Sequence, residues 1–184
     1  MKFVSSCIAT LVFASVLHTE EKPTLVTETF FVSGIECGSC VYAVQQSITE
    51  AKGVSQVTVL QLLDSYANVT FDPKQLSEHQ VAQAVREAYA LHGRPYLATL
   101  KVQVANYTQN AAKVDALFST WKNWVELEPI DKAKGELLIH FHELKSDAKK
   151  AGPQGWSLAQ FTEAMKSPAP KGLGLDFTLA KESE

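Results

Sequence analysis

Apolar and polar positions follow two alternating periods along the chain, one typical of β-strands and the other of α-helices. Residues 25–33 are rich in Val, Thr and Phe, which indicates a strand, and Gly34 ends it. Residues 40–51 then carry apolar side chains at every third or fourth position, the spacing of one helix face. The pattern therefore predicts a strand followed by a helix.

The pattern continues with two strands, a second helix and a further strand. Residues 54–63 and 66–71 are predicted to form a hairpin that ends before Pro73. Ser77 is a suitable N-cap for the next helix, because its hydroxyl oxygen can accept a hydrogen bond from a free backbone N–H group. The closing strand is expected to begin at Tyr96.

The second half of the chain repeats this order of elements. Its predicted elements are a strand at 100–107, a helix capped by Asn110, a hairpin of 125–130 and 137–144, a helix capped by Ser157 and a strand at 173–179. The order is that of the ferredoxin-like motif. We therefore predict an α+β fold of tandem ferredoxin-like βαββαβ units, each an antiparallel four-stranded sheet with two helices on one face. A coincidental mixture of helices and strands is the alternative.

The connection between the two halves is short. Only 13 residues lie between Tyr96 and Asn110. They must supply the last strand of the first unit and the first strand of the second, and at about 3.3 Å per residue they can do so only if the two strands are nearly continuous. We expect a rigid pair of units that shares one long strand.

The first residues have the pattern of a secretory signal. Lys2 is followed by an uncharged run from Phe3 to Leu17, which is too short for a comfortable membrane span of about 20 residues. We predict a signal peptide at 1–19, an exported protein that is periplasmic or secreted, loss of Cys7 with the signal, and no stable membrane span after cleavage. A buried N-terminal helix or a membrane anchor is the alternative.

Composition narrows the classes of function. Hydrophobic residues make up 46% of the chain, enough to build a core, and the net charge of -3 gives no basic excess for binding nucleic acid. Three cysteines are too few for a disulfide-built scaffold. The sequence contains no G-x-S-x-G, H-E-x-x-H or P-loop motif, so we expect no enzyme activity.

One motif carries chemistry: GIECGSC, which lies between the first strand and the first helix. Its cysteines, Cys37 and Cys40, have the C-x-x-C spacing and stand where a helix N-terminus favours thiolates. Thiolates select soft metal ions. Two such ligands alone suit Cu(I) or Hg(II), of which we expect Cu(I), whereas Zn(II) prefers four ligands and would need others from a second chain or from outside.

GIECGSC in this position resembles the heavy-metal-associated domain, a family that includes copper chaperones, modules of metal-pumping P-type ATPases and the periplasmic mercury-binding protein. Residues 66–73 are similar to its third-strand segment, and the resemblance covers about residues 25–100. It implies that Cys37 and Cys40 bind the metal. The family's usual Met is Ile35 here, which we expect to be a packing residue.

The second half lacks these cysteines. Aligning the two halves places Asn110 and Lys113 where Cys37 and Cys40 stand, and neither is a soft ligand. We therefore predict a heavy-metal-associated-like domain at 24–100 and a degenerate second ferredoxin-like domain at 101–184.

Several other residues are weaker candidates. His92 is a possible third ligand, and Arg94 a cationic neighbour that would stabilise a thiolate–metal complex; an ordinary loop is the alternative. His140 and His142 alternate along one strand and could share a metal or form a pH-sensitive patch, although a polar sheet face is the more common arrangement. Trp156 marks either a contact surface or ordinary packing, and so does Trp124.

These observations lead to one functional hypothesis and two alternatives. The hypothesis is an exported protein that binds a soft metal ion, Cu(I) foremost, and either sequesters it or transfers it to a partner with a similar cysteine pair. The first alternative is a thiol–disulfide redox module that uses the same cysteines. The second is a non-catalytic interaction scaffold in which the cysteines play no part.

Overall fold

The computed structural model describes residues 24–145 and 152–182. The predicted signal segment, with Cys7, lies outside these residues. The elements in chain order are β1 (Val26–Ser33), α1 (Gly38–Thr49), β2 (Val54–Leu60), β3 (Tyr66–Phe71), α2 (Glu78–Glu87), β4 (Leu97–Val104), α3 (Tyr107–Thr120), β5 (Val125–Asp131), β6 (Glu136–Phe141), α4 (Leu158–Lys166) and β7 (Phe177–Leu179). The predicted α+β fold class and the order of elements are confirmed.

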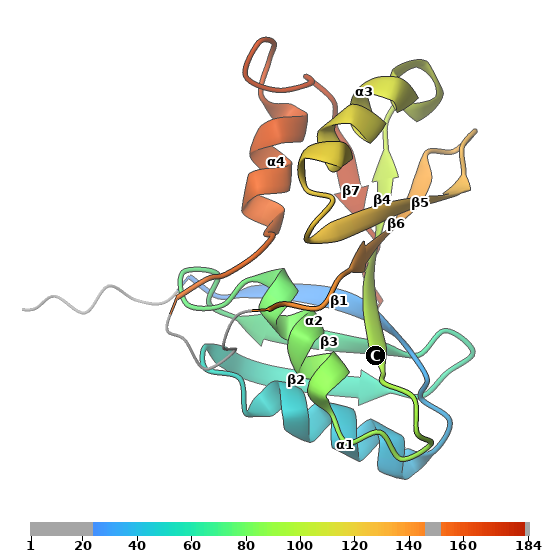
Figure 1. Ribbon diagram of the computed structural model, residues 1–184, viewed down its shortest axis with the longest axis vertical. Helices are drawn as coiled ribbons and strands as arrows, with labels where there is room; N and C mark the ends of the chain where they lie inside the picture. Colours follow the sequence, from blue (N-terminus) through green and yellow to red (C-terminus); the bar gives the residue numbers. More distant parts are fainter. Residues whose placement is uncertain (1–23, 146–151, 183–184) are drawn as a thin grey trace, which may run out of the picture.

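The two ferredoxin-like units share strand β4. The described strands form one antiparallel seven-stranded sheet in the order β2-β3-β1-β4-β6-β5, with β7 also paired to β4. The first unit (β1 to β4) uses β4 as its last strand, and the second unit (β4 to β7) uses it as its first. Figure 1 shows β4 running from one unit into the other. The two predicted four-stranded sheets are therefore merged into one.

The register shows how one strand serves two units. At its start, β4 pairs with β1 through Thr99 and Phe31, and at its end it pairs with β7 through Val102 and Leu179. Its other edge pairs with β6 from Thr99 to Gln103. Since β4 is bonded on both edges, the two units are joined by backbone hydrogen bonds and not by a loose linker. The predicted boundary between residues 100 and 101 falls inside this strand.

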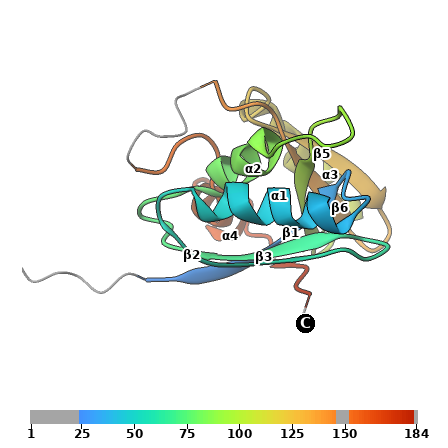
Figure 2. The ribbon, with the colours of Figure 1, turned by 90° about the horizontal axis from the view of Figure 1, so that it is seen from below.

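Serine N-caps mark the start of one helix in each unit. Ser77 is the N-cap of α2 and forms a capping box with Gln80, which supplies both the acceptor for the Ser77 N–H and the N–H for its hydroxyl. Ser157 caps α4 in the second unit. Both caps agree with the sequence prediction. Figure 2 shows α1 lying along the sheet formed by β1, β2 and β3.

The predicted start of α3 is wrong. Asn110 lies inside the helix, and the N-cap is Asn106 in a left-handed conformation with φ 55°. The chain turns sharply after β4, and Asn106 accommodates the positive φ that such a turn requires. The positions that match Cys37 and Cys40 relative to the helix start are therefore Asn106 and Gln109, and not Asn110 and Lys113 as predicted. Neither carries sulfur.

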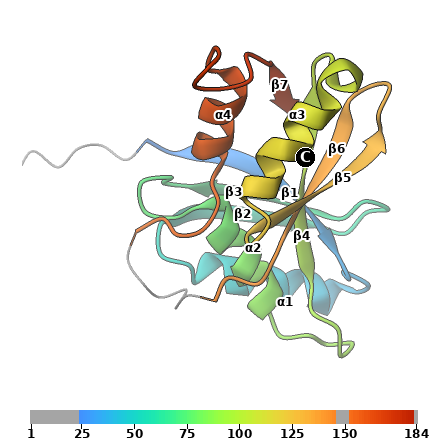
Figure 3. The same ribbon diagram turned by 45° about the horizontal axis from the view of Figure 1, so that its top comes forward.

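An aromatic cluster fills the core of the second unit. Trp156 is fully buried and contacts Trp121, Phe141 and Phe161 with ring centroids 5.8 to 6.1 Å apart. Trp156 is thus a packing residue and not part of a contact surface. Phe141 also contacts Phe30 of β1 at 6.4 Å, so the two cores are continuous. Figure 3 shows α3 and α4 over the second unit, with α2 on the side of the first unit that faces it.

Helix α2 is buried on both sides, by α1 of its own unit and by the second unit. Its polar side chains bond to residues within 141–145 and 152–158. His79 donates from Nε2 to the His142 carbonyl at 2.9 Å and accepts at Nδ1 from the Trp156 N–H at 3.2 Å. The other bonds from α2 are Glu78 to Leu158 N–H, Gln80 to Gln154 N–H and the Gly152 carbonyl, Gln83 to Leu144 N–H, and Arg86 to the Phe141 carbonyl. We call this set the α2 interface.

No helix among the described residues is long and apolar enough to cross a membrane.

Candidate metal centre

The two motif cysteines meet at the start of α1. Cys37 is the N-cap of the helix, and its sulfur accepts a hydrogen bond from the Cys40 N–H at 3.3 Å. The two Sγ atoms are 2.7 Å apart and both thiols are free. Cys37 is half-buried and Cys40 is fully buried. The two sulfurs are therefore close enough to bind the same ion, and Cys37 is the one that solvent can reach.

The surroundings of Cys40 favour its thiolate. Burial raises the pKa of the Cys40 thiol. Interactions with the Cys37 thiol, the Tyr96 hydroxyl and nearby backbone N–H groups outweigh this effect and lower the pKa to about 6. These interactions therefore favour the thiolate of Cys40. A thiolate, not a thiol, is the form that binds a metal ion.

Tyr96 is buried next to the cysteine loop. Its side chain is buried, and the Tyr96 hydroxyl has no hydrogen bond of regular geometry to any described residue, although it interacts with the Cys40 sulfur. Gly34 has φ +91°, and a Cβ there would lie 3.3 Å from the Tyr96 ring. A glycine thus allows the cysteine loop to fold against Tyr96. Ile35 is buried beside the loop, which confirms its predicted packing role.

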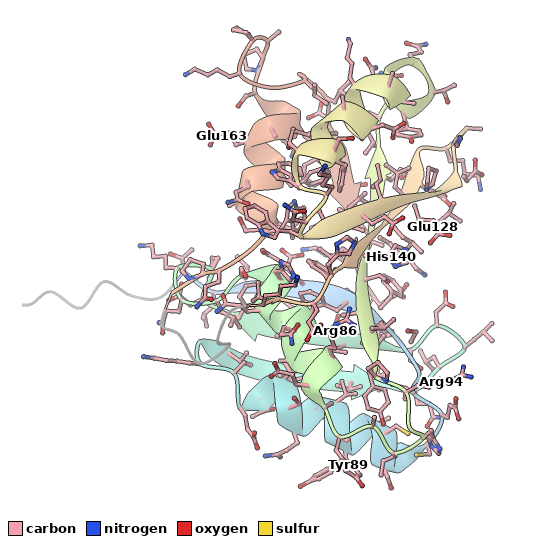
Figure 4. All side chains as sticks on the ribbon, in the orientation of Figure 1. Arg86, Tyr89, Arg94, Glu128, His140 and Glu163 are labelled. Atoms are coloured by element: carbon pink, nitrogen blue, oxygen red, sulfur yellow. The ribbon has the colours of Figure 1, made fainter. Side chains whose placement is uncertain are left out.

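His92 reaches the cysteines from the loop between α2 and β4. Its Nε2 lies 3.6 Å from the Cys37 Sγ. The ligand atoms of Cys37, Cys40 and His92 all lie within 4.8 Å of one another. Sequence reasoning named His92 as a possible ligand, and the structure brings it to the site although 52 residues separate it from Cys40. Arg94 is exposed on the same loop and is labelled in Figure 4.

The other candidate histidines lie elsewhere. His140 of β6 bonds to Glu128 at 2.7 Å, and His142, directly after β6, approaches Glu126 at 3.9 Å; both histidines are half-buried, and both glutamates are exposed on β5. Figure 4 shows His140 and Glu128 together, well away from Arg94. Within residues 24–145 and 152–182, the cysteine–His92 group is the one cluster of three such ligands, so the two strand histidines form paired polar positions and no metal cluster.

Comparison with known proteins places this site in a family. The sequence profile of the heavy-metal-associated domain matches residues 29–90, which include both cysteines. Two proteins of Haemophilus influenzae strain Rd, each described as an uncharacterized protein, are 36% identical to this chain over 62 residues, 34% of this chain and 88% of the relative. The chain belongs to the heavy-metal-associated domain family. Together with the paired cysteines, this membership supports binding of a heavy-metal ion.

Two solved structures have a distant likeness to most of the chain. The water-soluble region of the P-type ATPase CopA from Bacillus subtilis aligns with a TM-score of 0.37 and 15% identity, over 85% of this chain and 92% of that one. The N-terminal soluble domains of Bacillus subtilis CopA align with a TM-score of 0.35 and 15% identity, over 86% and 95%. At these scores the likeness adds no weight to the assignment.

Sequence reasoning missed Tyr96 as part of the heavy-metal-associated domain's site. It identified Tyr96 only as the start of a strand. The one available signal was an aromatic residue at the end of the loop that carries His92, and that signal does not say which way the ring points.

Proposed function

We propose that this chain is a non-enzymatic protein that binds a single Cu(I) ion through Cys37 and Cys40 and passes it to a partner. The observation that carries the proposal is the pair of free thiols, 2.7 Å apart at a helix N-terminus, in a heavy-metal-associated domain. Two thiolates are sufficient ligands for Cu(I), because it is soft and accepts low coordination numbers.

The unequal exposure of the two cysteines suits transfer. Cys40 is fully buried and holds the ion from inside, whereas Cys37 is open to an incoming ligand. A first partner thiolate forms a new sulfur–metal bond and the bond to Cys37 breaks; a second partner thiolate then binds and the bond to Cys40 breaks, which leaves the ion on the partner. The partner therefore needs a cysteine pair of its own. We further propose that the protein is exported, on the basis of the uncharged run from Phe3 to Leu17.

The test is an anaerobic Cu(I) titration against a competing chelator. Wild-type protein, fully reduced, is compared with the Cys37→Ser/Cys40→Ser double variant. We expect one tightly bound equivalent in the wild type and none in the variant. Equal binding by both proteins, or no tight binding by either, would rule out the two-thiolate site.

A thiol–disulfide module is the second candidate, since the sulfurs are close and the pKa of Cys40 is low. Its weakness is the location of the activated thiol. Exchange needs an accessible thiolate, yet Cys40, whose pKa is lowered, is fully buried. Measurement of the Cys37–Cys40 reduction potential, with an insulin-reduction assay, separates the two. Activity in that assay without Cu(I) binding would favour the redox function.

A further inference from the structure

The loop from 88 to 96 gives the cysteine site a third donor atom. The loop leaves the end of α2, turns at Gly93 with φ +74° and a bond from its N–H to the Ala90 carbonyl, and returns to β4 past the cysteines. This path places the imidazole of His92 beside the exposed sulfur of the pair, at 3.6 Å. Two sulfurs and one nitrogen thus surround one point.

The His92 ring also has freedom to close on that point. His92, Gly93 and Arg94 are all exposed, and a Cβ on Gly93 would meet no atom within 4 Å. Neighbouring packing therefore does not fix the loop tip in place. A small movement of the tip would bring Nε2 to bonding distance without disturbing the core.

We propose that His92 is a third metal ligand, so that the site offers two thiolates and one imidazole. This inference rests on the proposed metal-binding function and adds a residue that sets which ion is held. A neutral imidazole is a good ligand for both zinc and copper.

The third ligand has unequal effects on different ions. Cu(I) is satisfied by the two thiolates, so an imidazole adds little to its affinity. Zn(II) takes four ligands, and three protein ligands with one open position form a complete site of the kind found in zinc enzymes. His92 therefore raises the affinity of the site for Zn(II) relative to that for Cu(I).

The experiment compares metal affinities of the full, reduced chain and three variants. His92→Ala removes the proposed ligand. Tyr89→Ala, at an exposed position of the same loop, is the control for changes in that loop, and His140→Ala is the control for loss of a histidine elsewhere. Zn(II) and Cu(I) affinities are measured by competition with chelators. Co(II) absorption and the ¹¹³Cd chemical shift report the ligand set directly.

Loss of an outer-shell partner already costs about 10- to 100-fold in metal affinity, and we expect His92→Ala to weaken Zn(II) at least as much. Cu(I) affinity should fall less than about tenfold, because both thiolates remain. The Co(II) absorption and the ¹¹³Cd chemical shift should change from values typical of two sulfur ligands and one nitrogen ligand to values typical of two sulfur ligands. The control variants should match the wild type.

Unchanged Zn(II) affinity and unchanged spectra in His92→Ala would overturn the proposal. The same holds if Zn(II) affinity falls in His92→Ala but the Co(II) and ¹¹³Cd spectra match the wild type, since His92 would then be a hydrogen-bond partner and not a ligand. In either case, Cu(I) binding that still depends on the cysteines would leave the proposed function intact.

Discussion

Cys37 does two jobs in the structure. Its sulfur caps α1 by accepting from the Cys40 N–H, and the same atom faces solvent at the metal site. Serine is among the best N-cap residues, so Cys37→Ser keeps the cap while it removes the thiolate. The double serine variant is therefore expected to fold, and its loss of metal binding can be read as loss of ligands.

Gly155, beside His79 in the α2 interface, is a second single residue on which the stability of the fold depends. Its φ is +72°, and an added Cβ would collide with the His79 ring and contact Leu144. We predict that Gly155→Ala lowers the free energy of unfolding by about 2–4 kcal/mol, from backbone strain plus overpacking. Denaturant unfolding measures it.

Gly152 provides the matched control. Its φ is +92°, but a Cβ there would meet nothing within 4 Å. Gly152→Ala should therefore cost only the backbone strain, about 1–2 kcal/mol. Equal losses in the two variants would show that the contact with His79 is unimportant.

At the scale of elements, α2 is unusual because polar residues fill a buried face. Glu78, His79, Gln80 and Gln83 are all buried, and each finds a partner in the second unit. Buried polar groups are costly when a partner is lost. The α2 interface therefore holds the two units in one specific arrangement, and its stability depends on which groups are protonated.

The stability of the α2 interface should depend on pH through His79. Burial lowers the pKa of His79 below its usual 6.5, and the charges of His142 and Arg86 act in the same direction. A proton on Nδ1 would also face the Trp156 N–H donor. The unfolded chain takes up this proton first, so the folded state loses stability as the pH falls below about 6.5.

The measurement is denaturant unfolding between pH 7.5 and pH 5.5 for the wild type and His79→Asn. Burial raises the pKa of Glu28 to about 7 and also raises that of Glu78, and both groups favour the folded state as the pH falls. Comparing the two proteins cancels that opposite trend. The stability advantage of the wild type should shrink toward pH 5.5. His140→Asn, at a histidine outside the α2 interface, is the control and should keep the wild-type slope; a constant difference between wild type and His79→Asn would contradict the prediction.

Elements were predictable where local chemistry defines them, and not where distant contacts do. The caps at Ser77 and Ser157 were correct because a hydroxyl before a helix satisfies its free N–H groups. The start of α3 was wrong because a left-handed Asn106 leaves no distinctive pattern in the sequence. The burial of Trp156 depends on contacts with Phe141 and Phe161 from separate elements, which spacing alone cannot reveal.

At the scale of the whole molecule, β4 makes the two units one body. The short junction between Tyr96 and Asn110 predicted this sharing, because two separate strands would not fit in it. β4 pairs with β6, and Phe30 contacts Phe141. Each unit alone would therefore leave a strand edge and an apolar side chain exposed to solvent. The predicted metal site belongs to the first unit, but the fold that supports it depends on both.

Removal of the second unit should therefore have a defined effect. A chain that ends at residue 106 keeps both cysteines and His92 but exposes the edge of β4 that β6 covers. Unpaired strand edges associate with other chains. We predict self-association and a lower denaturation midpoint, measured by light scattering and chemical unfolding beside the full chain. A monomer as stable as the full chain would show that the first unit is independent.

The shared strand also sets an order of events on the ribosome. Cys37, Cys40 and His92 all precede the end of β4, so every part of the predicted metal site is synthesised before β6 begins at Glu136. Roughly thirty residues separate Val104 from Glu136, which is about 2 to 6 s of synthesis at about 5–20 residues per second. During this interval the nascent chain already contains both cysteines of the site, while the edge of β4 that pairs with β6 is still unpaired. Incorrect pairing of this edge of β4 with another strand would occur in those seconds, after the cysteine loop has formed and before β6 can pair with β4.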